Sequence, residues 1–361
     1  MSNLFEKYDA WLDDHGPAAL VIREHLMPVE GQDGVLFPAT FAASEDKTFK
    51  GGYNVDTFAD GRNICLIDSV GSQANRIEPL FARHLYAGLV PQVVIIAGTK
   101  RVNLLDAAHR AGDAIVRCSE LQQELRNAFQ QLQRGNAEPL AKIAPTSIIF
   151  GAWDSRDTQA KLPRLVASTI RAFDVRQLTR SAQFVPATEY VAEGLLDEPV
   201  DKKMQDAYSA RGFIHVPASG SPGGVIATGG ARRDASLHLA ALRLLAAGED
   251  KQKTLPLQRY ILGLALTAFT YPPSGYLRQG CNLVLDPDKP RVFSEVYSDG
   301  RRVPATVTPE EALGYAKAAA SQFGIGNDRE VQFDKEKAKA DISGESAKGG
   351  KKNAKAIKTA D

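Results

Sequence analysis

The sequence ICLIDSVGSQANRIEPLFARHLYAG, residues 64–88, contains the signals for one complete structural unit. Its apolar, β-branched start at residues 64–67 is typical of a buried strand. Glycine and small polar residues at 68–72 are typical of a turn. After this turn, the apolar positions that share one helical face are Ile77, Phe81 and Leu85. The segment therefore predicts a strand, a turn and a helix that ends at Gly88.

The junction between this strand and this helix is the first candidate binding site. Proline is tolerated only in the first turn of a helix, so Pro79 places the helix start near residues 75–78. Backbone N–H groups in a first turn lack partners, and the helix dipole favours an anion such as a phosphate. The candidate residues are Gln73, Asn75, Arg76 and Arg83. An ordinary strand–turn–helix with a polar cap explains the same residues, and the physics alone favours that interpretation.

Periodicity predicts most of the other elements. Helices are expected at 4–26 (broken near Gly16-Pro17), 119–133, 257–271 and 309–323, and strands at 91–98, 147–150 and 213–216. Residues 277–285 and 291–297 predict a closing hairpin. Strands and helices alternate without a regular βαβ rhythm, so the pattern favours an α+β fold.

Composition and cysteine usage limit the class of protein. A chain of 361 residues with 43% hydrophobic residues can bury a real core, which we place in a single domain at 1–330. Residues 331–361, with 8 Lys and 5 acids, predict a disordered tail. Residues 1–60 carry 4 basic and 11 acidic residues, so a total charge of +1 leaves a mildly basic middle, compatible with a nucleic-acid groove.

The expected environment of the protein follows from what the sequence does not contain. We find no leader and no apolar run of the roughly 18–20 residues that a membrane span needs. The cysteines are Cys65, Cys118 and Cys281, without a CxxC pair. We therefore expect a cytoplasmic protein with buried thiols, without a metal site, a cofactor or a membrane partner.

Two pairs of basic residues in the first half of the chain are further candidates for phosphate contacts. Lys100 and Arg101 directly follow the strand expected at 91–98. His109 and Arg110 stand between alanines in a stretch of mixed polarity. A lone His beside an Arg is more often a surface or capping residue than a catalytic one.

Trp153 and Arg156 lie in the loop expected at 151–163, after the strand at 147–150. Trp153 has Asp154 and Lys161 as further charged neighbours in the sequence. The ring can be a half-buried anchor with a polar tip. It can equally be a platform on which a base stacks, flanked by cations that bind phosphates. Both interpretations stay open at this point.

The remaining candidates lie in the middle of the chain. Arg164 and Arg171 belong to a stretch in which basic and apolar residues alternate, which predicts a basic-faced strand or a short helix. Arg232 and Arg233 follow a glycine-rich run at 220–230 that we expect to open a helix and so to bind an anion. The run matches neither a Walker motif nor GxGxxG.

Six segments carry a resemblance to a known family. They are LFPATFA (36–42), IDSVGSQANRIEP (67–79), HRAGDAIVR (109–117), IIFGAWDSR (148–156), LPRLVASTIRAFDV (162–175) and LRQGCNLV (277–284). In order and content they resemble the CRISPR-associated backbone subunit of type I-G (formerly I-U) Cascade complexes, the Cas-seven group of the RAMP superfamily.

The resemblance implies a hand-shaped α+β fold. Its palm is a modified RNA-recognition-motif (ferredoxin-like) domain with large insertions, and we place a protruding thumb at about 189–212. It further implies a protein without enzymatic activity that binds CRISPR RNA and polymerises along it with further copies of itself. Such a filament works with other Cascade subunits and presents the guide for pairing with target DNA.

Two other functions remain as alternatives. A RAMP-type ribonuclease that cuts CRISPR or target RNA could use His109, His215, His238 or Asp68 beside Ser69. These residues form neither a G-x-S-x-G frame nor an HExxH motif. A small-molecule domain that binds a nucleotide has only the glycine-rich run at 220–230 to support it.

Overall fold

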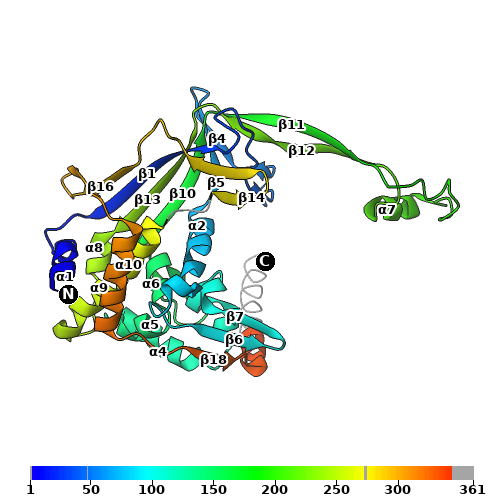
Figure 1. The fold of residues 1–361 in the computed structure, drawn as a ribbon. Coiled ribbons are helices and arrows are strands. Elements are labelled where there is room, and N and C mark those ends of the chain that lie inside the picture. Colours follow the sequence, from blue (N-terminus) through cyan, green and yellow to red (C-terminus); the bar gives the residue numbers. More distant parts are fainter. Residues whose placement is uncertain (1, 47, 272–274, 344–361) are drawn as a thin grey trace, which may run out of the picture.

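The computed structural model describes residues 2–46, 48–271 and 275–343. Its main feature is a curled antiparallel sheet (Figure 1). The strands of this sheet are β1 (Ala19–Pro28), β4 (Val55–Thr57), β5 (Asn63–Asp68), β10 (Val166–Phe173), β13 (Ala231–His238), β14 (Tyr276–Arg278), β15 (Cys281–Leu285), β16 (Val292–Val296) and β17 (Arg302–Pro304). They are ordered β14-β15-β1-β13-β10-β5-β4, and β16 pairs with both β1 and β17. The predicted α+β class is confirmed and is consistent with an RNA-recognition-motif-like palm.

Helices pack beneath this sheet (Figure 1). They are α1 (Ser2–Asp9), α2 (Val70–Ile77), α3 (Ala114–Arg117), α4 (Gln122–Gln133), α5 (Glu138–Ile143), α6 (Pro145–Phe150), α8 (Leu239–Arg243), α9 (Lys251–Thr270) and α10 (Pro309–Phe323), with 3-10 turns η1 (Glu78–Ala82), η2 (His84–Tyr86), η3 (Leu104–Asp106) and η4 (Arg110–Gly112). The expected helices at 257–271 and 309–323 are confirmed as α9 and α10. A Cβ at Gly263 would lie 2.7 Å from the Cα of Ala316, so a glycine is needed where α9 crosses α10. Within the described residues, no helix could cross a membrane.

Smaller sheets complete the molecule. They consist of β6 (Val93–Ala97), β7 (Lys100–Asn103) and β18 (Arg329–Gln332); of β2 (Thr40–Phe41) and β3 (Gly52–Tyr53); and of β8 (Ala152–Trp153) and β9 (Lys161–Leu162). The hairpin of β11 (Val175–Phe184) and β12 (Val216–Ala227) extends far from the body and carries α7 (Lys202–Ala210) at its end (Figure 1). Residues 189–212, where we expected the thumb, lie at this end of the hairpin.

Several sequence-based expectations are wrong. The helix expected at 4–26 ends at Asp9, and its second half is strand β1, in which buried residues alternate with more accessible ones. The strand expected at 147–150 is part of helix α6, which is buried on all sides. A short apolar run does not distinguish a buried strand from a buried helix. The closing hairpin is also absent from the described residues, because β15 and β16 both pair with β1 instead.

The boundary of the expected tail at residue 331 is also wrong. Strand β18 pairs in parallel with β6, and Val331 is buried. Beyond it, residues 335–343 are helical, and Lys337 Nζ donates to the Ser119 carbonyl at 3.0 Å. The rest of the expected tail, residues 344–361, lies outside the described residues.

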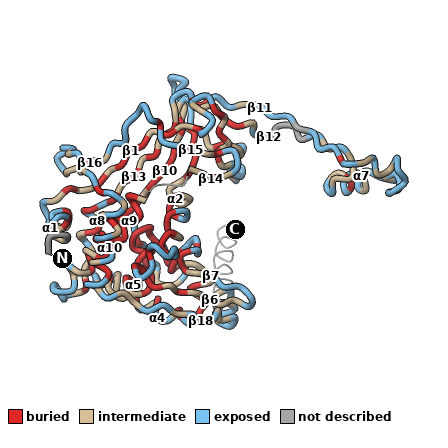
Figure 2. The backbone as a smooth tube through the Cα atoms, viewed as in Figure 1, coloured by how far each residue is buried: buried red, intermediate tan, exposed pale blue. Residues whose placement is uncertain are grey.

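Figure 2 shows buried residues both in the sheet and in the helices, and these residues form two apolar clusters. On β1, Leu20 and Ile22 belong to the larger cluster, which includes α9 and α10, and Leu26 belongs to the smaller one. Successive side chains of a strand alternate between faces, so Glu24 lies on the same buried face between the two clusters. A buried polar layer therefore crosses the sheet between two apolar regions.

Candidate nucleic-acid interface

Helix α2 begins five residues earlier than the proline suggested. Ser69 caps it, and its Oγ accepts a hydrogen bond from the backbone N–H of Ser72 at 3.2 Å. Pro79 lies instead in the first turn of η1, which directly follows α2. Gln73, Asn75 and Arg76 are therefore in the body of the helix. Their backbone N–H groups are not those of a first turn, so the predicted anion site at these residues is wrong. Their side chains make the contacts described below.

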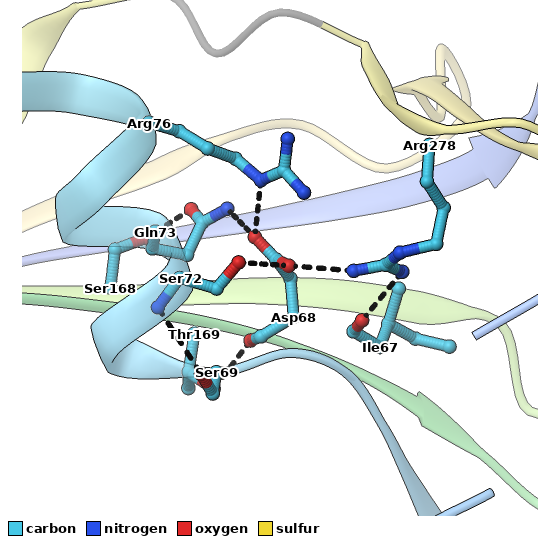
Figure 3. A network of polar contacts seen from close by, with 9 residues as sticks. All are labelled: Ile67, Asp68, Ser69, Ser72, Gln73, Arg76, Ser168, Thr169 and Arg278. Atoms are coloured by element: carbon cyan, nitrogen blue, oxygen red, sulfur yellow. Dashed lines mark hydrogen bonds and ion pairs between the residues drawn. The ribbon is translucent and has the colours of Figure 1, made fainter. Parts of the chain in front are cut away.

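The side chains of α2 converge on the buried carboxylate of Asp68, at the end of β5 (Figure 3). Asp68 accepts from Gln73 Nε2 at 2.6 Å, Arg76 Nε at 3.1 Å and Arg278 Nη2 at 2.9 Å. Ser72 Oγ is 2.8 Å from the same carboxylate. We call Asp68, Arg76 and Arg278 the Asp68 cluster.

The Asp68 cluster has one carboxylate for two guanidinium groups. The carboxylate is fully buried, whereas the side chains of Arg76 and Arg278 are 38% and 25% exposed. The terminal nitrogens of Arg76 point away from Asp68 (Figure 3). The cluster therefore presents an excess positive charge in a fixed position, which suits a phosphate. Sequence reasoning missed Arg278, although it lies in the segment 277–284 that carried part of the resemblance.

The polar layer beneath the sheet supports this cluster from inside. Ser168 Oγ lies 2.9 Å from Gln73 Oε1 and 3.5 Å from Arg233 Nη1. Arg233 Nε donates to Glu24 at 2.5 Å, and Arg291 is 3.2 Å from the same carboxylate. We call Glu24, Arg233, Ser168, Gln73 and Asp68 the inner polar layer.

Arg233 is therefore not a surface residue, contrary to the expectation that it binds RNA. It is 2% exposed, because it lies on β13, where the odd-numbered residues face the interior. The glycine run before it does not open a helix, since residues 216–227 are strand β12 and a turn leads into β13. Arg232 faces the other side of the sheet, 2.9 Å from Asp234 and over the ring of Phe173.

Arg110 connects α2 to the tryptophan loop. It is 4% exposed, and its Nε is 2.6 Å from Glu78. Its Nη1 donates to the Gly151 carbonyl at 3.2 Å and its Nη2 to Asn75 Oδ1 at 3.1 Å. Burial raises the pKa of Glu78 to about 7, and the neighbouring Arg110 opposes this change. Arg110 is thus a structural link, and its burial contradicts its expected role in direct RNA contact.

A pocket of about 630 Å³ opens beside this link, and we call it the Trp153 pocket. Five of the predicted residues line it: His109, Arg110, Trp153, Arg156 and Arg164. Arg117 and Lys161 add further cations, and none of the described residues that line the pocket carries a carboxylate. Trp153 is 59% exposed, with Lys161 Nζ 5.6 Å from its ring centroid. This exposure favours the stacking platform over the buried anchor.

The other predicted residues lie outside this pocket. Arg83 donates to the Tyr271 hydroxyl at 2.6 Å, and Arg101 forms an ion pair with Glu330. Lys100 is the exposed first residue of β7 and pairs with Ala97 of β6. Arg171 pairs in register with Arg232 across β10 and β13. The structure therefore brings together the residues of α2 and of the tryptophan loop, but not those of β13.

The candidate residues for a ribonuclease are dispersed. Asp68 is held by two arginines, and His109 is 3.5 Å from Asp113. His215 is 2.6 Å from Glu189, where β12 begins, and His238 is at the end of β13. Across the described ranges, no group of three or more His, Cys, Asp or Glu residues could hold a metal ion.

A family model matches part of the chain. Residues 20–177 match the family model described as CRISPR-associated protein GSU0053. The match supports a CRISPR-associated protein. It spans β5, α2, Arg110 and the tryptophan loop, whereas Arg233 and Arg278 lie beyond it. No curated protein matches the sequence. The narrower resemblance, to a type I-G backbone subunit, stays a prediction.

Proposed function

We propose that this CRISPR-associated protein binds single-stranded CRISPR RNA as the backbone subunit of a type I Cascade complex. In this proposal, copies assemble along the guide in the cytoplasm with other Cascade subunits. They hold the guide for pairing with target DNA, so that base pairing supplies the sequence specificity.

The Trp153 pocket is the observation that carries the proposal. It combines an exposed aromatic ring with several cations, and none of its described lining residues has a carboxylate. Aromatic rings stack on bases of any sequence, and cations bind the phosphates between them. Arg110 joins the pocket to α2, which holds Arg76 of the Asp68 cluster. Together they give a preformed, positively charged surface on adjoining elements.

The test is RNA binding at several salt concentrations, with two unrelated single-stranded RNAs of equal length. If about four to six phosphates are neutralised per protein, log K should fall with log salt at a slope of roughly −3 to −4. The two RNAs should bind with similar affinity. A tenfold preference for one sequence, or no binding at low salt, would contradict the proposal.

Assembly and catalysis need separate measurements. Protein purified from cells that contain a CRISPR array should carry RNA, with a higher 260/280 nm absorbance ratio and a larger size than protein from cells without an array. Labelled RNA incubated with the protein, with and without EDTA, should stay intact. Cleavage under single-turnover conditions would favour the alternative, a ribonuclease.

A further inference from the structure

We infer that the Trp153 pocket holds a single unpaired nucleotide, with its base stacked on Trp153 and its phosphate against the basic wall that includes Arg164. The inference rests on the proposed function and makes it more specific. A pocket of about 630 Å³ lies within the range of roughly 300–1,000 Å³ that is usual for small-molecule sites. The site is thus a pocket for one nucleotide, in addition to a charged surface for the strand.

The loop that carries Trp153 is held in position before any ligand arrives. Trp153 pairs with Lys161 in the small sheet of β8 and β9. Asp154 Oδ2, in the next residue, accepts from the Thr158 N–H at 2.8 Å and its hydroxyl at 2.6 Å, which closes the loop. Arg126 on α4 makes two hydrogen bonds to Asp157, at 2.7 and 2.8 Å, and fixes the loop to the body. A loop that is already ordered loses little entropy when a base stacks on its aromatic ring.

The backbone behind the ring is packed closely. A Cβ at Gly112 would lie 2.9 Å from the Trp153 carbonyl oxygen, so η4 and β8 approach too closely for a side chain at position 112. Gly151 has a φ of +78°, and a Cβ there would lie 2.9 Å from Arg164 Cγ. These two glycines let the aromatic ring and the Arg164 side chain belong to one pocket.

The charge of the pocket selects the ligand. Lys161 Nζ is 5.6 Å from the Trp153 ring centroid, and Trp153 is 59% exposed, so ring surface is available to a base. Two cations at the edge, the buried Arg110 and the partly buried Arg117, have carboxylate partners within the protein, Glu78 and Asp341. A ligand must then be both aromatic and anionic, as a nucleoside monophosphate is.

The chain offers a direct optical test, because it has 2 tryptophans. Trp11 is 7% exposed and donates to Glu295, far along the sequence from the pocket. In the full-length Trp11→Phe variant, all tryptophan fluorescence comes from Trp153. We expect AMP to quench it saturably. Adenosine should bind about tenfold more weakly, because the charge-assisted hydrogen bonds to phosphate are missing. Inorganic phosphate should compete with AMP without quenching.

Two further variants make the test specific. In the Trp11→Phe background, Arg164→Gln should weaken AMP binding about tenfold, whereas Arg171→Gln, on β10 outside the pocket, should leave it unchanged. Circular dichroism melting of each variant verifies folding. Equal binding of AMP and adenosine, or an unchanged Kd for AMP by calorimetry in Trp153→Ala, would overturn the inference.

RNA binding by the same variants separates this inference from the proposed function. Suppose that single-stranded RNA binds Trp153→Ala as tightly as it binds the unchanged protein, and that AMP does not quench the fluorescence of Trp11→Phe. The inference of a nucleotide pocket is then wrong, while the proposed function stands. If AMP quenches as expected but no RNA binds at low salt, the pocket is retained and the proposed function is wrong.

Discussion

The inner polar layer and the Trp153 pocket use arginine in opposite ways. In the layer, Arg233 is 2% exposed and faces the carboxylate of Glu24 at 2.5 Å, with apolar clusters on both sides. In the pocket, cations surround an exposed ring, and none of the described lining residues is acidic. Arginines that cannot be told apart from their local sequence therefore have different roles. Those in the layer stabilise the fold, and those in the pocket are available to bind a ligand.

The number of nearby carboxylates and the degree of burial together decide whether an arginine stabilises the fold or binds a ligand. A buried guanidinium with its carboxylate cannot reach an external phosphate. A partly exposed guanidinium that exceeds the local negative charge can bind one. The Asp68 cluster lies between the two extremes, since its carboxylate is buried but its two arginines reach the surface.

The largest effect should come from the inner polar layer. Arg233→Met leaves the buried Glu24 without its closest cation, and we expect a loss of about 3–5 kcal/mol in the free energy of unfolding. Arg291 lies 3.2 Å from the same carboxylate and still pairs with it, so we expect the loss to be near the lower value. Urea unfolding followed by circular dichroism measures it. The control, Arg232→Met on the opposite face of β13, should lose about 1 kcal/mol or less. Equal losses for both variants would remove the distinction between layer and surface.

A smaller loss of stability should follow from removal of residues 331–361. This deletion cuts β18, uncovers β6 and removes the buried Val331, and we expect a loss of about 1.5–3 kcal/mol in the free energy of unfolding. It also removes Asp341, the partner of Arg117 at the pocket edge. Deletion of residues 344–361 is the matched control and keeps all of these contacts. Thermal unfolding should show a lower Tm for the longer deletion only, and an equal Tm for both would disprove a structural role of β18.

A substitution in the Trp153 pocket should change RNA affinity and leave the stability of the fold unchanged. Trp153→Ala should weaken single-stranded RNA binding by about 1–3 kcal/mol, with little change in the salt slope, because stacking involves no charge. The melting temperature should stay the same, since the side chain is 59% exposed. Fluorescence anisotropy and thermal unfolding measure the two quantities. A variant that unfolds but keeps its affinity per folded molecule would identify the ring as part of the core.

The smallest effect should come from the Asp68 cluster. Arg76→Ala removes one of two cations, and Arg278 still pairs with the buried Asp68, so we expect the fold to persist. RNA affinity should fall by a similar amount for every sequence, and the salt slope should decrease by about 0.7. Arg301→Ala, near the turn between β16 and β17, is the control for loss of one surface charge. If both variants change the salt slope equally, Arg76 contributes to RNA binding no more than any other surface charge.

The sequence alone determined those elements that depend on local signals. Thr308 and Glu311 form a capping box at the start of α10, and the apolar spacing that follows is enough to predict this helix with its correct bounds. Strand β5 was predicted from its own apolar, β-branched run, whereas the turn expected at 68–72 is mostly helix, because α2 begins at Val70. The resemblance, carried by short segments, added the palm-like fold and drew attention to α2 and to the tryptophan loop. All of these signals act between residues that are close in the chain.

Which arginines can reach a ligand depends on long-range packing. Arg232 and Arg233 are adjacent, and a strand places one on each face, but the pairing of β13 with β1 decides that Arg233 meets Glu24 inside. Arg278 reaches Asp68 from 210 positions away, and Arg110 joins Asn75 to Gly151. Contacts over such distances depend on strand register and on the packing of helices. Local periodicity contains no information about either, because the interaction energies that fix them arise between segments far apart in the chain.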